Sequence, residues 1–443
     1  MQKDQQKLVF DEETIRALLG HEAAEDEDIE KLRKYYVKTE IYEKLNSSIP
    51  LYVLVGHKGV GKSALLKVLE QEDSERGNIS ITIQPDDVID IKQEKTEFLQ
   101  RIRDWKEGLA KIIFKELAIK IQTYSSNDEN NKWVEKLKSL ILNLIGQTFD
   151  YLNERYLHLS SEQLNSFFKN DLFKERTVTI YLDDLDRGWK NSDGDIENLS
   201  AMLNAVRDLN RETTNLRFRV ALRSDVYYSD ETTDKIDGSV LWLKWSNHEI
   251  LVMLIKRIEA FYGSNPDEKV LLSLEQKTLA SYLDKIFEDR FRGRGHWCNA
   301  PMYRVLMSLI RKRPRDLVKL CTLAARKAYD NNHNLIMTND LESIFSNYSN
   351  DRLTDTGNEY QSELPKIKEL LLKMKPTTKE IRSGKPCKFS RGELLQKLNN
   401  IISMSCIRFK NGRNATASDL AAFLYKINFI PQGLHNLPAS FPL

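Results

Sequence analysis

The most informative stretch of the chain is Gly56-His57-Lys58-Gly59-Val60-Gly61-Lys62-Ser63, which has the P-loop pattern G-x-x-x-x-G-K-[ST]. An apolar run precedes it and a helix-forming run that starts at Ala64 follows, so strand, loop and helix come in the required order. Glycines let the backbone turn its N–H groups toward a phosphate, and the helix N-terminus adds positive charge. Lys62 can reach the β- and γ-phosphates, and the Ser63 hydroxyl can bind Mg²⁺. Residues 56–64 therefore predict a nucleotide-binding site; the alternative is an ordinary strand–turn–helix.

A second stretch predicts a strand that ends in carboxylates, residues 177–182 followed by Asp183-Asp184-Leu185-Asp186-Arg187. A continuous β-rich run is typical of a buried parallel strand, and ligands bind beyond the carboxyl ends of such strands. In a P-loop protein Asp183 would hold the Mg²⁺ shell and Asp184 would polarise the attacking water. The alternative is a strand followed by an acidic turn.

Three further runs predict strands at residues 79–83, 216–225 and 240–245. Arg223 lies at the end of the second of these and would face the γ-phosphate, because ligands lie beyond the strand ends. Five strands with helical crossovers predict an α/β fold, a P-loop NTPase domain with three αβα layers. A helical pattern at about 91–168 predicts an insertion within this domain.

The sequence predicts four parts: an N-terminal helical segment at 1–50, the P-loop NTPase domain at 51–246, a helical lid at 247–350, and a C-terminal module at 351–443. The size and helix spacing of the last part are typical of a winged-helix-like α+β module. Residues 365–426 hold 14 Lys and Arg against 4 Asp and Glu, whereas the whole chain has a net charge of +2. This basic module either contacts DNA or presents a solvated surface.

Composition favours a globular cytoplasmic protein that does not span a membrane. The chain has 443 residues, of which 41% are hydrophobic and 30% charged. Its apolar runs fall short of the roughly 20 residues that a membrane span needs, and its first residues lack the apolar core of a signal peptide. The four cysteines show no C-x-x-C spacing, which argues against a zinc site or a disulfide framework.

Two other stretches have two interpretations each. The acidic residues 22–28 beside a helix start either complement the helix dipole or belong to a turn that covers an adenine. The arginines of residues 290–294 either reach a neighbouring subunit's phosphate or lie in a solvated turn.

Together these motifs resemble the STAND, KAP and Orc-like branch of AAA+-type P-loop ATPases. The string from Asp183 to Arg187 resembles the KAP Walker B region, and residues 222–225 resemble the strand-end arginine of STAND proteins. Residues 313–317, Arg-Pro-Arg-Asp-Leu, are similar to the sensor 2 helix of Orc-like ATPases, which implies that Arg315 senses a phosphate. The closest resemblance, as far as about Lys375, is to a family of bacterial P-loop ATPases named after a cyanobacterial member.

The resemblance implies an ATP- and Mg²⁺-binding switch that hydrolyses slowly and assembles into a homo-oligomer. Relatives of this kind often serve in anti-phage defence, where an ATPase licenses a partner effector protein. We therefore expect an ATPase whose reaction depends on Lys62, Asp183, Asp184, Arg223 and Arg315. An Orc-like, DNA-binding ATPase is the main alternative, and a metabolic kinase is a third.

Overall fold

The computed structural model divides the chain into two compact units, one from His21–Lys269 and the other from Met1–Gly20 together with Val270–Leu443. It describes residues 8–23, 26–89, 91, 97–124, 132–146, 159–190, 192–213, 215–227, 237–382 and 389–430. Among the helices of these residues, none is long and apolar enough to cross a membrane.

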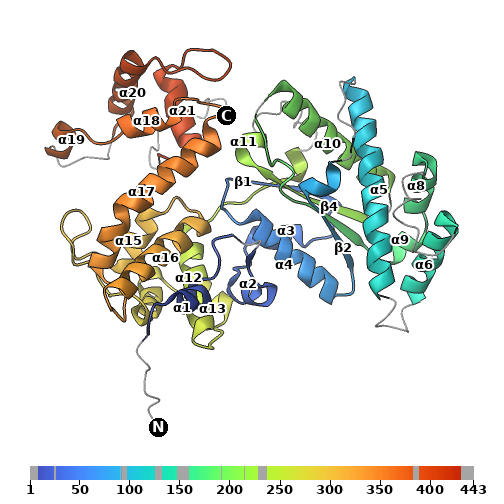
Figure 1. Ribbon diagram of the computed structural model, residues 1–443, viewed down its shortest axis with the longest axis horizontal. Helices are drawn as coiled ribbons and strands as arrows, with labels where there is room; N and C mark the ends of the chain where they lie inside the picture. The colour runs from blue at the N-terminus through green and yellow to red at the C-terminus, as the bar shows by residue number, and fades with distance from the viewer. Residues whose placement is uncertain are drawn as a thin grey trace, which may run out of the picture. The chain divides into compact units, whose positions relative to one another are not determined.

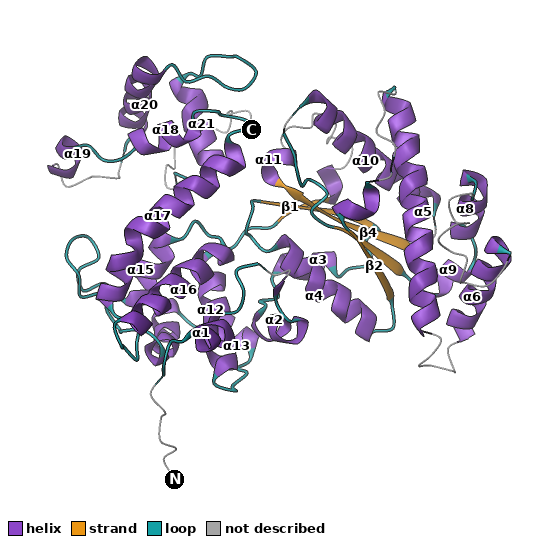
Figure 2. Cartoon of the chain, viewed as in Figure 1, coloured by secondary structure: helices purple, strands orange, loops and turns teal. Residues whose placement is uncertain are grey.

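The first unit is built on a parallel sheet, drawn in orange in Figure 2. Its order is β2-β3-β4-β1-β5, and its strands are β1 (Leu51–Gly56), β2 (Ile79–Ile83), β3 (Val178–Leu182), β4 (Leu216–Arg223) and β5 (Val240–Trp242). Strands β1 and β3 are buried along their whole length, as expected for a parallel sheet covered on both faces. The predicted α/β class is confirmed, and β4 and β5 are shorter than the predicted runs 216–225 and 240–245.

Helices cover both faces of this sheet (Figure 1). Helix α4 packs on one face, and α10 packs on the other together with α5, its principal neighbour. The helices of the unit are α2 (Ile29–Tyr35), α3 (Glu40–Leu45), α4 (Lys62–Glu75), η2 (Pro85–Val88), α5 (Phe98–Tyr124), α6 (Lys132–Ile145), α8 (Ser161–Phe168), α9 (Leu172–Glu175), α10 (Asp193–Glu212), α11 (Ser224–Tyr227), η6 (Asp237–Ser239) and α12 (Asn247–Phe261). Helix α13 (Glu268–Ser273) spans the boundary between the units.

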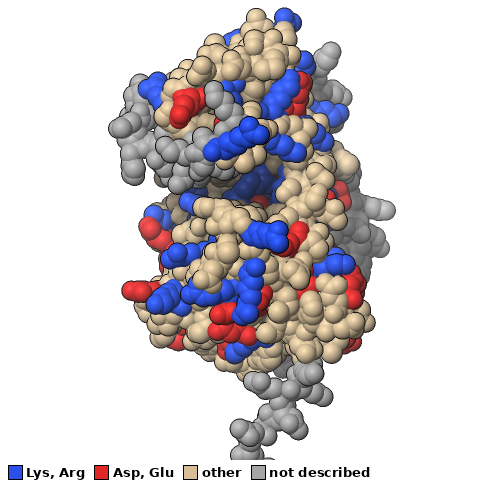
Figure 3. Space-filling view, turned by 90° about the vertical axis from the view of Figure 1, so that its left-hand side faces the viewer, with Lys and Arg blue, Asp and Glu red and all other residues tan. Residues whose placement is uncertain are grey.

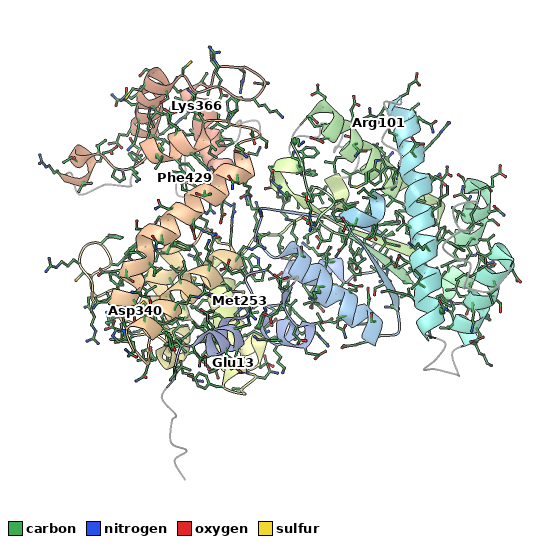
Figure 4. The ribbon with its side chains drawn as sticks, in the orientation of Figure 1. Glu13, Arg101, Met253, Asp340, Lys366 and Phe429 are labelled. Atoms are coloured by element: carbon green, nitrogen blue, oxygen red, sulfur yellow. The ribbon has the colours of Figure 1, made fainter. Side chains whose placement is uncertain are left out.

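The predicted helical insertion corresponds to α5, α6 and α8. Phe114, Phe167 and Phe173 are buried there, with ring centroids 5.0 and 5.2 Å from Phe167 in edge-on geometry. Arg101 on α5, labelled in Figure 4, pairs with Glu197 on α10 at 2.9 Å. The insertion is therefore tied to the sheet domain by apolar and ionic contacts. Residues 125–131, whose polar sequence predicts a loop between the helices of the insertion, lie outside the described residues.

The second unit is helical. Its elements are α1 (Glu12–Leu19), α14 (Gln276–Leu279), η7 (Ala280–Lys285), α15 (Met302–Leu309), α16 (Pro314–Asp330), α17 (Thr338–Tyr360), α18 (Ile367–Lys373), α19 (Thr378–Arg382), α20 (Arg391–Ser405) and α21 (Ala417–Lys426). Helix α1 packs on α16, where Arg326 pairs with Glu12 at 2.6 Å. Asp340, labelled in Figure 4, is fully buried at the start of α17 and accepts hydrogen bonds from Asn331, His333 and the Met337 N–H.

The end of α17 begins a separate apolar core with α18, α20 and α21. Tyr360, Leu398 and Leu420 are completely buried in it. Lys366, labelled in Figure 4, donates to the Ser405 carbonyl at 2.7 Å and so ties α18 to the end of α20. The sequence patterns of residues 390–398 and 417–425 predict two short helices in this module, and they correspond to α20 and α21.

Candidate nucleotide-binding site

The P-loop connects β1 to α4 at the place where the strand order reverses. From β1 the chain crosses to β2 at one edge, and from β4 it crosses over β1 to β5 at the other edge. Ligands of open α/β sheets bind at this kind of switch point, beyond the carboxyl ends of the strands. The 14-residue helix α4 begins at Lys62, so the N–H groups of its first turn and its positive dipole end lie at this edge.

The glycines of the loop are required by its geometry. Gly59 and Gly61 have φ of 79° and 93°, a region that side-chain-bearing residues rarely adopt. A Cβ at Gly56 would lie 2.8 Å from Val60 Cγ2 and 3.3 Å from the Leu243 carbonyl oxygen. The loop therefore needs glycine for backbone conformation at two positions and for space at a third.

Trp245, in the segment after β5, supports the loop. The sequence patterns did not predict this contact. The buried indole N–H of Trp245 donates to the Val60 carbonyl at 2.7 Å. The run 240–245 predicts that Trp245 lies within the strand, whereas β5 ends at Trp242. The large aromatic side chain at the end of the predicted run 240–245 is the one sequence feature that could have indicated this contact.

Lys62 and His57 connect the loop to its surroundings. Lys62 Nζ lies 3.1 Å from the Gly56 carbonyl oxygen, so its ammonium is folded back over the loop. His57 Nδ1 lies 2.9 Å from the Ser224 hydroxyl, just after β4. Lys58 is exposed, Ser63 is half-buried in the first turn of α4, and Ala64 is buried.

The carboxylates after β3 have different environments. The Asp183 N–H donates to the Ile83 carbonyl at 3.1 Å, which extends the pairing of β3 with β2 by one residue, and its side chain is half-buried. Asp184 has a φ of 58°, and its carboxylate pairs with Arg187 at 2.6 Å. The Asp184 side chain is 43% exposed.

Asp186 is the buried carboxylate of this turn. It is 6% exposed, and its Oδ2 accepts the Arg223 N–H at 2.8 Å. Burial raises the pKa of the Asp186 carboxyl, although the Lys62 ammonium and the Arg223 N–H act in the opposite direction. In the sequence, Asp186 belongs to the acidic string Asp183–Arg187, but no pattern assigns it a role.

Arg223 ends β4 beside the P-loop, in register with Gly56 of β1. Its guanidinium forms a two-pronged contact with Asp225, with Nε–Oδ1 and Nη2–Oδ2 distances of 3.1 and 2.6 Å. Asp225 is 5% exposed. The structure thus brings Gly56–Ser63, Asp183 and Arg223 to one edge of the sheet, as the sequence predicts.

The Ser63 hydroxyl and the Asp183 carboxylate are oxygen ligands of the kind that Mg²⁺ prefers. Mg²⁺ in nucleotide sites is typically bound by one or two protein side chains together with phosphate oxygens and waters. Ser63 and Asp183 can supply such a pair, because α4 begins and β3 ends at the same edge of the sheet.

Comparison with known proteins gives one family match, over residues 249–357, to the FunZ-associated C-terminal helical domain. The chain is 23% identical over 382 residues to an 80.3 kDa protein of transposon gamma-delta from Escherichia coli (strain K12). This match covers 79% of this chain and 52% of that protein. The chain therefore spans about half the length of this relative. It is also 28% identical over 150 residues, 34% of its length, to Allergen Alt a 2 of Alternaria alternata, 68% of which is covered.

The following three are among the similar solved structures. A Walker-type ATPase of Pyrococcus abyssi has a TM-score of 0.36 at 16% identity, covering 90% of this chain and 95% of that chain. The Aeropyrum pernix ORC2 protein has a TM-score of 0.42 at 11% identity, covering 90% of each chain. The Thermotoga maritima RuvB Holliday junction branch migration motor has a TM-score of 0.36 at 10% identity, covering 87% of this chain and 95% of that one. These likenesses are distant, and the fold assignment rests on the sheet order and the loop.

Arg315 lies within the region of the family match, in the helical unit. It is the second residue of α16, after Pro314, and is half-buried. Pro314 stands at the first helical position, where its missing N–H costs nothing. The structure places Arg315 in a different unit from the P-loop, so its predicted role as a phosphate sensor stays a prediction.

The loop of residues 290–297 uses two of its arginines locally. Arg290 Nη1 donates to the Asn299 carbonyl at 2.7 Å, and Arg292 pairs with Glu288 at 2.6 Å. These contacts favour the interpretation as a solvated turn over a role at a neighbouring subunit.

The acidic N-terminal stretch is partly described and contacts the P-loop helix. Glu27 is buried and accepts the His21 N–H at 2.7 Å, while its carbonyl accepts from Lys67 of α4, also at 2.7 Å. Asp28 caps α2 by accepting the Lys31 N–H, which agrees with the helix-start interpretation. Ala24 and Glu25 of the predicted adenine-covering turn lie outside the described residues.

Proposed function

We propose that the protein is an ATP-binding and ATP-hydrolysing switch. The observation that carries the proposal is the P-loop itself: a glycine-dependent turn at the switch point of a parallel sheet, with Lys62 folded over it and the N-terminus of α4 behind it. N–H groups, an ammonium and a helix dipole converge there, which is the chemistry that a polyphosphate requires.

The site residues have separate roles in this proposal. Lys62 and the N–H groups of residues 56–64 hold the phosphates, while Ser63 and Asp183 would bind the Mg²⁺ that accompanies ATP and neutralises its negative charge. Asp184 would orient the attacking water, and Arg223 and Arg315 would respond to the γ-phosphate. Catalysis in such sites comes mainly from positioning and electrostatic stabilisation.

A switch, rather than a metabolic kinase, is favoured by the presence of a helical unit beyond the ATPase unit. Nucleotide that binds one arrangement of these units more tightly than another would shift their populations. We further propose that the switch forms a homo-oligomer and acts on an effector protein in anti-phage defence. That part of the proposal rests on the sequence resemblance described above.

The variant Lys62→Ala tests the ATPase. Because a hydrogen bond to a charged group contributes about 1.5–3 kcal/mol, ATP affinity should fall roughly 10- to 100-fold. Hydrolysis should fall about 100-fold or more as well, since the lysine also faces charge that develops in the transition state. A fluorescent ATP analogue and a phosphate-release assay measure the two.

Lys44→Ala is the matched control, because Lys44 forms an exposed pair with Glu40 on α3. It should bind and hydrolyse ATP as the wild type does. Wild-type binding and hydrolysis by Lys62→Ala would show that the ATPase proposal is wrong.

A second candidate function, a DNA contact, is favoured by a basic hairpin in the C-terminal module. Arg408 and Asn414 form an antiparallel bridge, and the Ala415 N–H donates to the Ile407 carbonyl at 3.1 Å. Arg408, Lys410 and Arg413 are exposed on this hairpin. In the view of Figure 3, Lys and Arg side chains are more prominent than acidic ones in the upper part, where α18 to α21 lie.

Salt-dependent DNA binding tests this second function. Fluorescence anisotropy with a labelled duplex should show affinity that falls steeply with salt, and Arg408→Ala with Lys410→Ala should reduce the salt slope by about two. Lys277→Ala, which removes an exposed charge on α14, should leave it unchanged. Absence of binding at low salt, with and without ATP, would exclude this function.

A further inference from the structure

The turn after β3 holds two carboxylates with opposite surroundings. Asp184 is half-buried, with 43% of its side chain exposed, and it pairs with Arg187, whose side chain is 67% exposed. Asp186, two residues later, is almost completely buried. Burying a carboxylate costs free energy unless hydrogen bonds and nearby cations compensate. The burial of Asp186 therefore suggests that its position serves the site.

Asp186 connects two strand ends of the nucleotide site. The Asp186 carbonyl accepts the Trp189 N–H at 3.2 Å, which closes the turn after β3. Its carboxylate accepts the N–H of Arg223, the last residue of β4. Strand β4 lies between β3 and β1, so this bond fixes the turn that carries Asp183 against the strand that flanks the P-loop.

The same carboxylate shares its surroundings with the charged side chains of the site. The Lys62 ammonium and the Arg223 guanidinium both stabilise its negative charge, whereas the Asp225 carboxylate opposes it. Asp225 in turn holds the Arg223 guanidinium through two hydrogen bonds. One carboxylate thus orients the main chain of Arg223, and the other orients its side chain.

We infer that Asp186 is a positioning residue of the nucleotide site: it holds the main chain of Arg223 at the end of β4, and its negative charge acts on the Lys62 ammonium. The inference rests on the proposed ATPase function and adds to it a residue that acts through Lys62 and Arg223. Asp186 itself need not touch the nucleotide. Removing a side chain that orients a functional residue typically lowers activity by about 10- to 100-fold, as is known for the partners of metal ligands.

The central test is Asp186→Asn, which keeps the size of the side chain and an oxygen that can accept the Arg223 N–H. Saturation kinetics of ATP hydrolysis should show a kcat about 10-fold lower or more, with KM changed by less than about 3-fold, because phosphate contacts made by the loop remain. Asp186→Ala, which also removes the acceptor, should lower kcat further. Because an unfolded fraction would also lower the apparent kcat without changing KM, rates are normalised to the folded fraction measured by circular dichroism.

A double-mutant comparison separates positioning from an independent effect. If Asp186 acts in part through the Arg223 side chain, adding Asp186→Asn to Arg223→Ala should lower kcat by clearly less than Asp186→Asn lowers it in the wild type. Full multiplication of the two single effects would contradict action through Arg223. Asp193→Asn, an exposed carboxylate in the first turn of α10, is the matched control and should hydrolyse ATP at the wild-type rate.

The outcomes distinguish this inference from the proposed function. If the wild type binds and hydrolyses ATP while Asp186→Asn has wild-type kcat, the inference is wrong and the ATPase stands. If the wild type neither binds nor hydrolyses ATP, the proposed function is wrong and the inference is overturned with it. Should Asp186→Asn fail to fold, Asp225→Asn tests the same unit from the other side and should lower kcat without raising KM.

Discussion

The two units each contain a cluster of buried and half-buried charged side chains, and each cluster combines cations with carboxylates. The strand-end cluster consists of Lys62, Asp186, Arg223 and Asp225. The helix cluster joins the start of α16 to the second half of α17 and consists of Arg311, Arg313, Asp316, Arg352 and Glu359. One lies around a glycine loop at the end of a sheet, and the other lies between two packed helices.

The titration of the central groups differs between the clusters. In the helix cluster, burial acts to lower the pKa of Arg313, but the negative charge of Glu359 outweighs it and the pKa is raised. The charged pair is therefore favoured in the folded state. In the strand-end cluster, burial raises the pKa of Asp186 despite the cations beside it. The negative charge of Glu359 thus favours charged Arg313 in the folded state, whereas burial disfavours the charged form of Asp186.

The largest expected effect is that of breaking the helix cluster with Glu359→Ala. Glu359 is 5% exposed and pairs with Arg313 at 2.9 Å, and Arg313 is itself 4% exposed. Removing one partner of a buried pair leaves the other charge uncompensated, which costs about 3–5 kcal/mol in the free energy of unfolding. Urea denaturation followed by circular dichroism measures this change.

The control for Glu359→Ala lies on the same helix. Asp351 of α17 pairs with Lys319 at 2.7 Å but is 49% exposed. Asp351→Ala should cost less than about 1 kcal/mol, as is usual for a pair at the surface. Equal losses for the two variants would mean that burial does not distinguish the helix cluster from a surface pair.

A smaller effect is expected from Trp245→Phe, which loosens the loop beside the strand-end cluster. The variant keeps most of the buried ring but removes the N–H that donates to the Val60 carbonyl. Leaving a buried acceptor without its partner costs about 1–3 kcal/mol. The affinity for ATP, measured with a fluorescent analogue, should fall as well, because the loop is held less firmly in its phosphate-binding form.

Phe261→Leu on α12 is a suitable control for Trp245→Phe, because it also shortens an aromatic side chain but does not touch the loop. It should leave the affinity for ATP at the wild-type value. If Trp245→Phe also leaves that affinity unchanged, the P-loop does not depend on its anchor to the segment after β5.

The sequence was sufficient to predict the loop and the sheet because both depend on local signals. Glycine spacing predicts the P-loop, and apolar runs predict the five strands, including the one that ends at Arg223. It was not sufficient to distinguish Asp184 from Asp186, since the difference arises from a positive φ at one and from burial against β4 at the other. Trp245 was missed for a related reason, because a contact between distant segments leaves no periodic pattern.

The pH dependence of stability provides a test of the strand-end cluster. A carboxyl whose pKa is higher in the folded state than its usual 3.8 contributes stability below that value and loses it as the pH rises through the raised pKa. Asp186→Asn cannot ionise, so at neutral pH it should be more stable than the wild type, by about 1.4 kcal/mol for each unit of the shift. Below about pH 4 the difference should disappear.

Urea denaturation of the wild type and Asp186→Asn from pH 4 to pH 8 measures this difference. A variant that is less stable than the wild type at neutral pH would show that the charged carboxylate supports the fold, as in the helix cluster. The contrast between the two clusters would then be lost.

The smallest effect is expected for Arg187→Ala, because the Asp184–Arg187 pair lies in the same turn as Asp186 but faces solvent. Exposed pairs contribute about 0–1 kcal/mol and are screened by salt. The free energy of unfolding should therefore change by no more than about 0.5 kcal/mol in low salt and by less in 1 M NaCl, whereas the loss in Glu359→Ala should persist at high salt. A decrease of more than about 1 kcal/mol in the free energy of unfolding of Arg187→Ala that does not depend on salt would contradict this expectation. Asp184 would then behave as a buried carboxylate, as Asp186 does.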